Sequence, residues 1–234
     1  MEEWRHQDGE ESQGVGSRHT QVDSAVGGQP FMRDKLRGND HDAFVEVLAE
    51  AVGALEESAI PYAVIGGIAS SGFGRPRWTH DIDLFVRPAD AARALDCLSK
   101  AGFTTERTDI TWLFKGFKRQ VMVDVIFKSK GDFYFDEEMM QRAVSGQFQG
   151  RRVRFIPPED LLVLKAVVHD EAGAHHWHDA LGVIAGTSLD WAYLLRRAQR
   201  APRRILALLA YAHSIDLPVP NKVIRRLFEQ VYDS

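Results

Sequence analysis

The chain has 234 residues, 44% hydrophobic and 26% charged, so it is long enough to bury a core and has the composition of a globular protein. The formal net charge of −4 argues against nucleic-acid binding by the whole surface but leaves room for a local basic patch. The single cysteine, Cys97, excludes an intramolecular disulfide and a cysteine-rich zinc site.

The N-terminal region differs in composition from the rest of the chain. Residues 1–40 are rich in Gly, Gln, Ser and acidic residues and lack an apolar period, which predicts a disordered tail. Met32 as the true start is an alternative interpretation. The first residues do not resemble a signal peptide, and no stretch is apolar over the length of a membrane-spanning helix. We therefore expect a cytoplasmic protein without a membrane partner.

The first predicted elements are a helix and two strands. Asp40 is a residue type that caps helices, and apolar residues recur at helical spacing over residues 44–55. Pro61 then precedes a short apolar run, residues 62–65, which predicts a buried strand ending at a glycine pair. A second strand is predicted over residues 82–86.

The following segment continues this alternation of strands and helices. Pro88 opens a predicted helix that runs to about Ala101. Two strands are predicted over residues 111–114 and 121–127, separated by a basic turn at residues 115–119. Residues 152–155 predict a short edge strand.

The pattern after residue 157 indicates helices only. Apolar residues recur at helical spacing in five successive segments: residues 161–168, 180–184, 189–198, 203–213 and 221–232. The predicted fold class is α/β (α+β), with a small mixed-sheet core over residues 41–157 and a helical bundle over residues 158–234.

Three aspartates in the predicted strands point to metal chemistry. Side chains alternate along a strand, so Asp81 and Asp83 share one face while Ile82 turns to the core. Asp124 interrupts an otherwise apolar strand, and burial of an unpaired carboxylate is costly. Because hard divalent cations prefer carboxylate oxygens, the three acids predict a shared metal site.

A glycine pair precedes these acids. Gly66 and Gly67 end a strand, where they permit close approach of backbone amides to a phosphate, and the N-terminus of a following helix favours an anion. A glycine pair alone is equally compatible with a plain turn. The ordered set is more specific: a strand with two glycines, an Asp-x-Asp strand, and one acid in a later apolar strand.

This ordered set resembles the nucleotidyltransferase superfamily that includes DNA polymerase beta, tRNA nucleotidyltransferases and antibiotic adenylyltransferases. Gly66 and Gly67 match the glycine pair, Asp81 and Asp83 the metal-binding pair, and Asp124 the third acid. The resemblance implies an enzyme that moves a nucleoside monophosphate (NMP) from a nucleoside triphosphate (NTP) to an acceptor hydroxyl, releasing pyrophosphate. The three acids would be catalytic and would hold two Mg²⁺ ions, with Mn²⁺ as an alternative.

Motifs in the helical part narrow the resemblance. The segments 158–166, 177–179 and 189–194 are similar to stand-alone bacterial nucleotidyltransferases related to abortive-infection and toxin–antitoxin enzymes. In those proteins a lysine contacts nucleotide phosphates and a later aspartate belongs to the active site; Lys165 and Asp179 match these positions. Together with the loop before the acid pair, the implied nucleotide-binding residues are Gly66, Gly67, Ser70, Arg75, Arg77, Lys165 and Asp179.

Alternatives remain open for these polar residues. Lys165 is also compatible with an ammonium that reaches solvent from an apolar helix, and Asp179 with a solvated or capping position. Seven basic residues predict either a rim that holds triphosphate or RNA, or an ordinary solvated surface: Arg75, Arg77, Lys115, Lys118, Arg119, Arg151 and Arg152.

The acceptor is open at this stage. The similarity of the helical part favours RNA, in particular tRNA, modified by a toxin-like enzyme, with an antitoxin protein as a further partner. The alternatives are an antibiotic acceptor such as an aminoglycoside or lincosamide, a protein acceptor, or a non-catalytic module that binds nucleotide.

Overall fold

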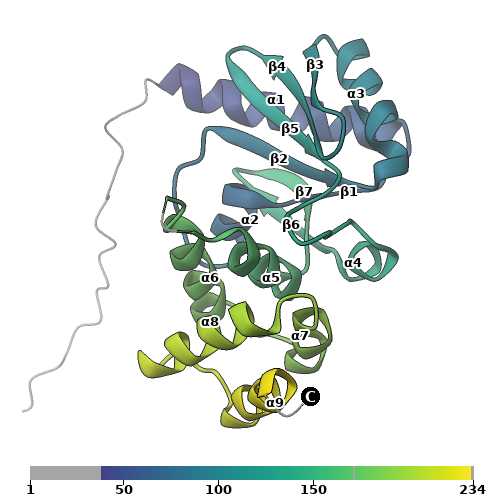
Figure 1. The fold of residues 1–234 in the computed structure, drawn as a ribbon. Coiled ribbons are helices and arrows are strands. Elements are labelled where there is room, and N and C mark those ends of the chain that lie inside the picture. Colours follow the sequence, from purple (N-terminus) through teal and green to yellow (C-terminus); the bar gives the residue numbers. More distant parts are fainter. Residues whose placement is uncertain (1–37, 171, 233–234) are drawn as a thin grey trace, which may run out of the picture. The chain divides into compact units, whose positions relative to one another are not determined.

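The computed structural model describes residues 38–170 and 172–232 (Figure 1). The predicted tail falls outside the described residues except for its last three. Helix α1 (Gly38–Glu57) begins two residues before the predicted start at Asp40. Among the residues described, none of the helices combines the length and apolar character that crossing a membrane requires.

A seven-stranded mixed sheet runs through the first part of the described chain, in the order β3-β4-β5-β2-β1-β7-β6 (Figure 1). β2 pairs with β5, and β1 with β7, in parallel; the other neighbours are antiparallel. The strands are β1 (Tyr62–Val64), β2 (Asp81–Val86), β3 (Thr104–Asp109), β4 (Leu113–Lys118), β5 (Val121–Ile126), β6 (Val144–Phe148) and β7 (Arg151–Phe155).

The two faces of the sheet carry different side chains. Ile82, Val123 and Gly116 are register partners across β2, β5 and β4, and α3 (Ala91–Lys100) packs on this face, since a Cβ at Gly116 would lie 3.2 Å from Leu98. The opposite face therefore receives the alternate residues of these strands, which include all three predicted metal ligands.

Helices follow the last strand. α5 (Pro158–Val168) is buried along almost its whole length and packs against α6 (His175–Gly186), α7 (Trp191–Ala198) and α8 (Pro202–Ser214), while α9 (Asn221–Tyr232) packs on α7 and α8. The remaining helical elements are α2 (Gly66–Gly72), η1 (Pro88–Asp90) and α4 (Glu137–Arg142). This confirms the predicted fold class, a mixed-sheet core followed by helices.

Several predicted boundaries were wrong. The segment interpreted as a basic turn, residues 115–119, lies mainly in β4, and the turn is formed by Arg119 and Gln120, whose φ angles are 47° and 63°. The strand expected at the edge, β7, lies between β1 and β6. β3, β6 and α4 were not predicted; both strands are sheet edges and are largely exposed, so they lack a buried alternation.

Candidate active site

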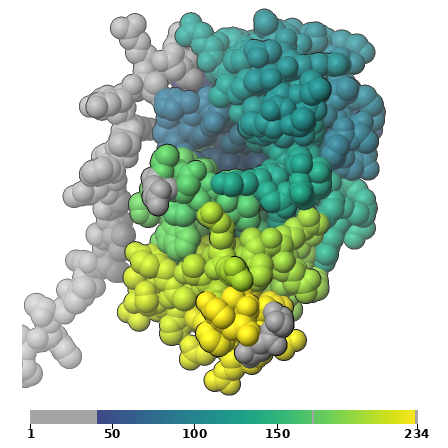
Figure 2. Space-filling model, viewed as in Figure 1, coloured from purple at the N-terminus to yellow at the C-terminus, as the bar shows by residue number. Residues whose placement is uncertain are grey.

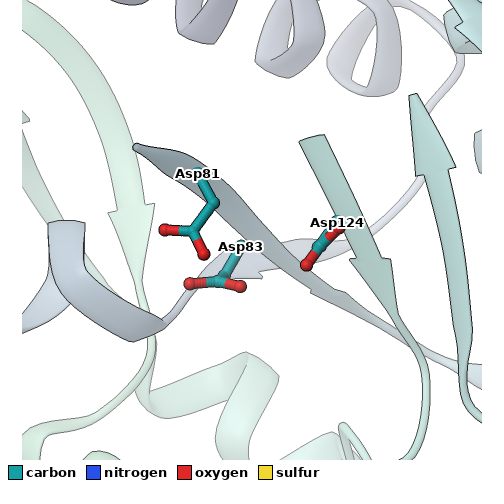
Figure 3. Close-up of side chains that lie close together, drawn as sticks. All are labelled: Asp81, Asp83 and Asp124. Carbon is teal, nitrogen blue, oxygen red and sulfur yellow. The ribbon is translucent and has the colours of Figure 1, made fainter. Parts of the chain in front are cut away.

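Three carboxylates meet on the open face of the sheet. The parallel register of β2 and β5 places Asp83 opposite Asp124, and Asp81 lies two residues earlier on the same face. One carboxylate oxygen from each residue lies within 4.8 Å of the others (Figure 3). Ile82 and Leu84 turn away and are fully buried, as the strand alternation predicted.

The electrostatics of this triad fit a cation. Burial, reinforced by the negative charges of Asp81 and Asp124, raises the pKa of Asp83 to about 7. Burial also raises the pKa of Asp124, against the opposing effect of Lys115. Within the described residues no hydrogen bond is donated to the Asp83 carboxylate, whereas Asp81 accepts one of 2.6 Å from Thr79 Oγ1. Three oxygen ligands with mutual repulsion and one unsatisfied member are a donor set suited to a hard divalent ion.

The glycine pair makes room for these side chains. Gly66 has a φ of +65°, and a Cβ placed there would lie 1.7 Å from Oδ2 of Asp83. A Cβ at Gly67 would lie 2.6 Å from the hydroxyl of Thr79. Ser70, on α2, donates a 2.8 Å hydrogen bond back to the Gly66 carbonyl. Both positions of the turn require glycine because a carboxylate and a hydroxyl group of the site lie directly against its backbone.

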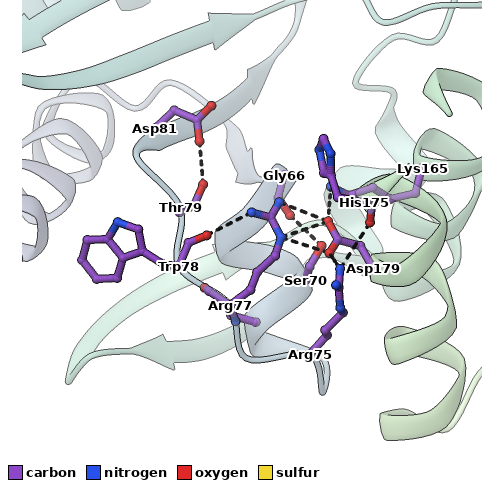
Figure 4. A network of polar contacts seen from close by, with 11 residues as sticks. Gly66, Ser70, Arg75, Arg77, Trp78, Thr79, Asp81, Lys165, His175 and Asp179 are labelled. Carbon is purple, nitrogen blue, oxygen red and sulfur yellow. Dashed lines mark hydrogen bonds and ion pairs between the residues drawn. The ribbon is translucent and has the colours of Figure 1, made fainter. Parts of the chain in front are cut away.

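A second charged cluster lies beside the glycine turn (Figure 4). Asp179, on α6, is fully buried and accepts from three cations. Lys165 Nζ lies 2.8 Å from Oδ2, Arg77 forms a two-pronged contact at 3.0 and 3.1 Å, and Arg75 Nη1 contacts Oδ1. The cluster therefore holds three positive charges against one negative charge.

The cations of this cluster control the ionisation of Asp179. Although burial opposes its charge, Lys165 and Arg77 lower the pKa of Asp179 to about 2. Burial lowers the pKa of Lys165, against the effect of Asp179. Neither Lys165 nor Asp179 is exposed, so the alternative interpretations of a solvent-reaching lysine and a solvated aspartate were wrong. Lys165, Arg75 and Arg77 lie together around Asp179.

Lys115 was not predicted as a partner of the triad. It lies opposite Asp124 in the β4–β5 pair, and its Nζ is 2.7 Å from Oδ1 of Asp124. In a hairpin with a two-residue turn at Arg119 and Gln120, residues at equal distances from the turn lie opposite each other. The position of the turn would therefore have predicted the pairing of Lys115 with Asp124. The signal was hidden because Lys115 was assigned to the turn itself.

The remaining members of the predicted basic rim lie elsewhere. Lys118 and Arg119 form ion pairs with Glu50 of α1, at 2.5 and 2.9 Å. Arg151 and Arg152 start β7, at the end opposite to Phe155, which pairs with Val64 beside the glycine turn. The predicted rim is therefore divided, and only Arg75, Arg77 and Lys115 contact residues of the candidate site.

A cavity of about 530 Å³ opens beside the triad. In Figure 2 the surface is recessed between the teal atoms of the strands and the green atoms of the first C-terminal helices. Asp83 and Gly66 lie at the cavity, and α5 lines it with apolar side chains and Lys165. His176 also lines the cavity. Burial and the positive charge of Lys165 lower the pKa of its imidazole to about 4, so the ring is neutral at pH 7. The full lining is Ile65, Gly66, Asp83, Thr111, Trp112, Ile126, Lys128, Ser129, Lys130, Leu161, Leu164, Lys165, Val168 and His176.

Two solved structures share this fold. The antibiotic-resistance factor ANT(2'')-Ia is 18% identical, with a TM-score of 0.51 over 73% of this chain and 97% of that chain. An antigenic nucleotidyltransferase-like protein from Paracoccidioides brasiliensis is 14% identical, with a TM-score of 0.52 over 82% of this chain and 98% of that chain. At these identities the similarity concerns the fold alone.

No curated protein matches the sequence significantly. A family model described as "Nucleotidyl transferase of unknown function (DUF2204)" matches residues 44–200, more than half of the chain and all the residues of the candidate site. The chain therefore belongs to this nucleotidyltransferase family.

Proposed function

We propose that this protein is a metal-dependent enzyme that transfers an NMP from an NTP to an acceptor hydroxyl and releases pyrophosphate. The observation that carries the proposal is the meeting of three carboxylate oxygens within 4.8 Å, beside a glycine turn whose backbone lies against Asp83. Asp81, Asp83 and Asp124 would hold the ions, two Mg²⁺ on our proposal with Mn²⁺ as an alternative. Bound there, the ions would supply Lewis-acid activation of the acceptor hydroxyl and charge neutralisation of the triphosphate.

The side chains around the triad have distinct proposed roles. Asp124 accepts the proton of the acceptor hydroxyl; Lys115 occupies its Oδ1 and leaves Oδ2 available. The two uncompensated positive charges of the cluster around Asp179 favour a polyphosphate next to the glycine turn. Lys165 lines the cavity itself, so among these cations it is the one positioned to contact the nucleotide directly.

The acceptor is proposed to be RNA, tRNA in the first place, as in a toxin-like enzyme with an antitoxin partner. This proposal rests on the similarity of the helical part to toxin-like enzymes. Among the described residues that line the cavity, Lys130 forms no ion pair, whereas Lys128 is paired with Asp132 and Lys165 with Asp179. An antibiotic such as an aminoglycoside or a lincosamide is the second candidate, since the fold is shared with an antibiotic-resistance factor. A protein acceptor is a third.

Transfer of label tests the proposal directly. The full chain is incubated with each α-labelled NTP, Mg²⁺, and either total RNA or a panel of antibiotics, and the label on the acceptor is measured. We expect label on RNA that disappears with a chelator and in Asp81→Asn. Asp96→Asn, on the exposed surface of α3, removes the same charge away from the site and should behave as wild type. Full transfer by Asp81→Asn would refute the carboxylate site, and label on an antibiotic alone would remove only the RNA acceptor.

A further inference from the structure

Lys115 is aligned with two of the three carboxylates across the sheet. Asp83 on β2 is the register partner of Asp124 on β5, and Asp124 is in turn the partner of Lys115 on β4. Because β5 lies between β2 and β4, Lys115 approaches Asp124 from the side away from Asp83. Its Nζ lies 2.7 Å from Oδ1 of Asp124, and the two side chains are only 19% and 12% exposed. Solvent therefore screens this charge pair weakly.

Lys115 pairs with Asp124 although a second acid is also its register partner. Glu106, on β3, lies opposite Lys115 on its other side, is exposed, and forms no ion pair in the described part of the chain. The other contact of the Lys115 ammonium is uncharged, Sδ of Met122 at 3.1 Å. The positive charge is therefore directed at one oxygen of one carboxylate of the triad.

The other two carboxylates are contacted by uncharged groups. Oδ1 of Asp81 accepts the hydroxyl of Thr79 at 2.6 Å, and Oδ2 of Asp83 lies against the backbone of Gly66. A carboxylate oxygen has more than one lone pair, so an uncharged neighbour leaves it able to bind a cation as well. An ammonium does not, because it repels the cation. Lys115 therefore restricts Asp124 in a way that neither of the other acids is restricted.

This restriction acts on the number of oxygens that Asp124 offers to an ion. Ca²⁺ takes six to eight oxygen ligands at about 2.3–2.6 Å and often binds both oxygens of one carboxylate, whereas Mg²⁺ requires octahedral geometry at about 2.0–2.1 Å. An ion held by both oxygens of Asp124 would lie at most about 5 Å from Nζ of Lys115. Positive charges so close together in a half-buried site repel each other strongly. An ion held by Oδ2 alone can lie further from the ammonium, on the side of Asp83.

We propose that Lys115 selects the metal of the site: it makes Asp124 a ligand through one oxygen and thereby favours Mg²⁺ over Ca²⁺. The inference rests on the proposed metal-dependent function and adds the residue that discriminates between ions. Lys115 is a positioning residue in this role, because it acts through Asp124 and does not itself touch the ion.

The test measures the binding of each ion to the full chain without nucleotide. Mg²⁺ and Ca²⁺ are titrated separately by calorimetry into wild type and Lys115→Met. Loss of the ammonium should strengthen the binding of both ions, because a repelling charge is gone. The affinity for Ca²⁺ should rise on the order of tenfold more than the affinity for Mg²⁺, since both oxygens of Asp124 become available. The change in the ratio of the two affinities separates this role from a simple effect of charge.

Two variants serve as controls. Lys115→Arg keeps a cationic donor for Oδ1 of Asp124 and should retain the wild-type ratio. Lys100→Met removes an exposed charge at the end of α3, which packs on the other face of the sheet, and should also match wild type. Melting curves with a chelator check that each variant is folded. Lys115→Gln, which is also uncharged, gives the same comparison if Lys115→Met does not fold.

The possible failures of the inference and of the proposed function are distinct. A ratio that is unchanged in Lys115→Met, or that rises equally in Lys115→Arg, would overturn the selection by Lys115 and leave the proposed NMP transfer intact. Failure of both ions to bind wild type at millimolar concentrations would overturn the inference together with the metal dependence of the proposed function.

Discussion

Replacement of Asp83 by asparagine should stabilise the metal-free protein. The Asp83 carboxylate has no hydrogen-bond donor among the described residues, and burial with the charges of its two acidic neighbours raises its pKa from 3.8 to about 7. A carboxyl group whose folded-state pKa is raised is fully compatible with folding only while protonated. Its stabilising contribution is present below the unfolded pKa, near 4, and is lost as the pH rises through 7. At pH 8 the ionised group therefore costs folding free energy.

The size of the effect follows from the pKa shift. Each pKa unit corresponds to about 1.36 kcal/mol, so a shift of about three units gives an upper value of about 4 kcal/mol. Asp83 also borders the cavity and so keeps contact with solvent, which reduces this cost to roughly 2–3 kcal/mol. For a domain of this size, 1 kcal/mol moves the melting temperature by about 2–4 °C. We therefore expect Asp83→Asn to melt roughly 5–10 °C above wild type at pH 8 with a chelator present.

Melting curves at several pH values test the linkage. With a chelator, the difference between Asp83→Asn and wild type should be small at pH 4 and grow up to pH 8. Mg²⁺ should raise the melting temperature of wild type more than that of the variant, because the ion replaces the missing partner of the carboxylate. Asp96→Asn controls for the loss of one charge on the surface. A variant that is no more stable than wild type at pH 8, or a difference that does not vary with pH, would refute the reasoning.

Three further substitutions probe the surroundings of the triad. Gly66→Ala should abolish transfer and destabilise the fold by more than about 1 kcal/mol, because a Cβ there meets a carboxylate oxygen at 1.7 Å; Gly53→Ala, with open space around its Cβ inside α1, should stabilise by about 0.5–1 kcal/mol in the same melts. Asp179→Ala should cost about 3–5 kcal/mol in denaturant titrations at pH 7, because it leaves three cations without their counter-ion. Since the folded pKa of Asp179 is lowered to about 2, its contribution is present above pH 4 and is lost towards pH 2, so equal destabilisation at pH 7 and pH 2 would contradict its role. Tyr193→Phe should lower the free energy of unfolding by about 1–3 kcal/mol in the same titrations, because the buried Asp160 loses the 2.5 Å hydrogen bond from the Tyr193 hydroxyl. Unchanged stability would mean that this hydrogen bond does not stabilise the fold.

The central strands were predictable because most of their side chains are apolar and buried. β2 and β5 consist of apolar residues except where an aspartate turns to the site, so the aspartates stand out against an otherwise uniform pattern. The strand alternation then placed Asp81 and Asp83 on one face without any knowledge of the neighbouring strands. The correctly predicted features, the two central strands and the shared face of Asp81 and Asp83, follow from the pattern of apolar residues within single strands.

The outer strands could not be predicted in the same way. β3 has the sequence Thr-Thr-Glu-Arg-Thr-Asp, borders only β4, and leaves most of its side chains exposed, so no face is marked by apolar residues. The turn that sets the β4–β5 register has positive φ at Arg119 and Gln120, positions where Asn and Gly are usual. Arg119 and its neighbour Lys118 both form ion pairs with Glu50 on α1. This tertiary contact supports a turn that its own residue types do not predict.

The second charged cluster depends on contacts between distant parts of the chain. Arg75 and Arg77 reach Asp179 across about a hundred residues, and no period or spacing in the sequence specifies such a contact. The position of Asp179 was implied only by resemblance to other nucleotidyltransferases. Its three cationic partners were assigned separately to phosphate binding, and their mutual neutralisation became visible only in the structure.

The charges of the two clusters suggest why nucleotide and metal should bind together. Three ionised carboxylates and Lys115 leave an excess of two negative charges, and the cluster around Asp179, beside the glycine turn, leaves an excess of two positive charges. The site as a whole is therefore close to neutral. A fully ionised triphosphate alone would make it strongly negative, which is unfavourable in a partly buried site, whereas the same triphosphate with two divalent cations adds no net charge. On the proposed function, NTP affinity should thus depend steeply on Mg²⁺, and this dependence should weaken in Asp83→Asn because one of the charges that requires the ion is gone.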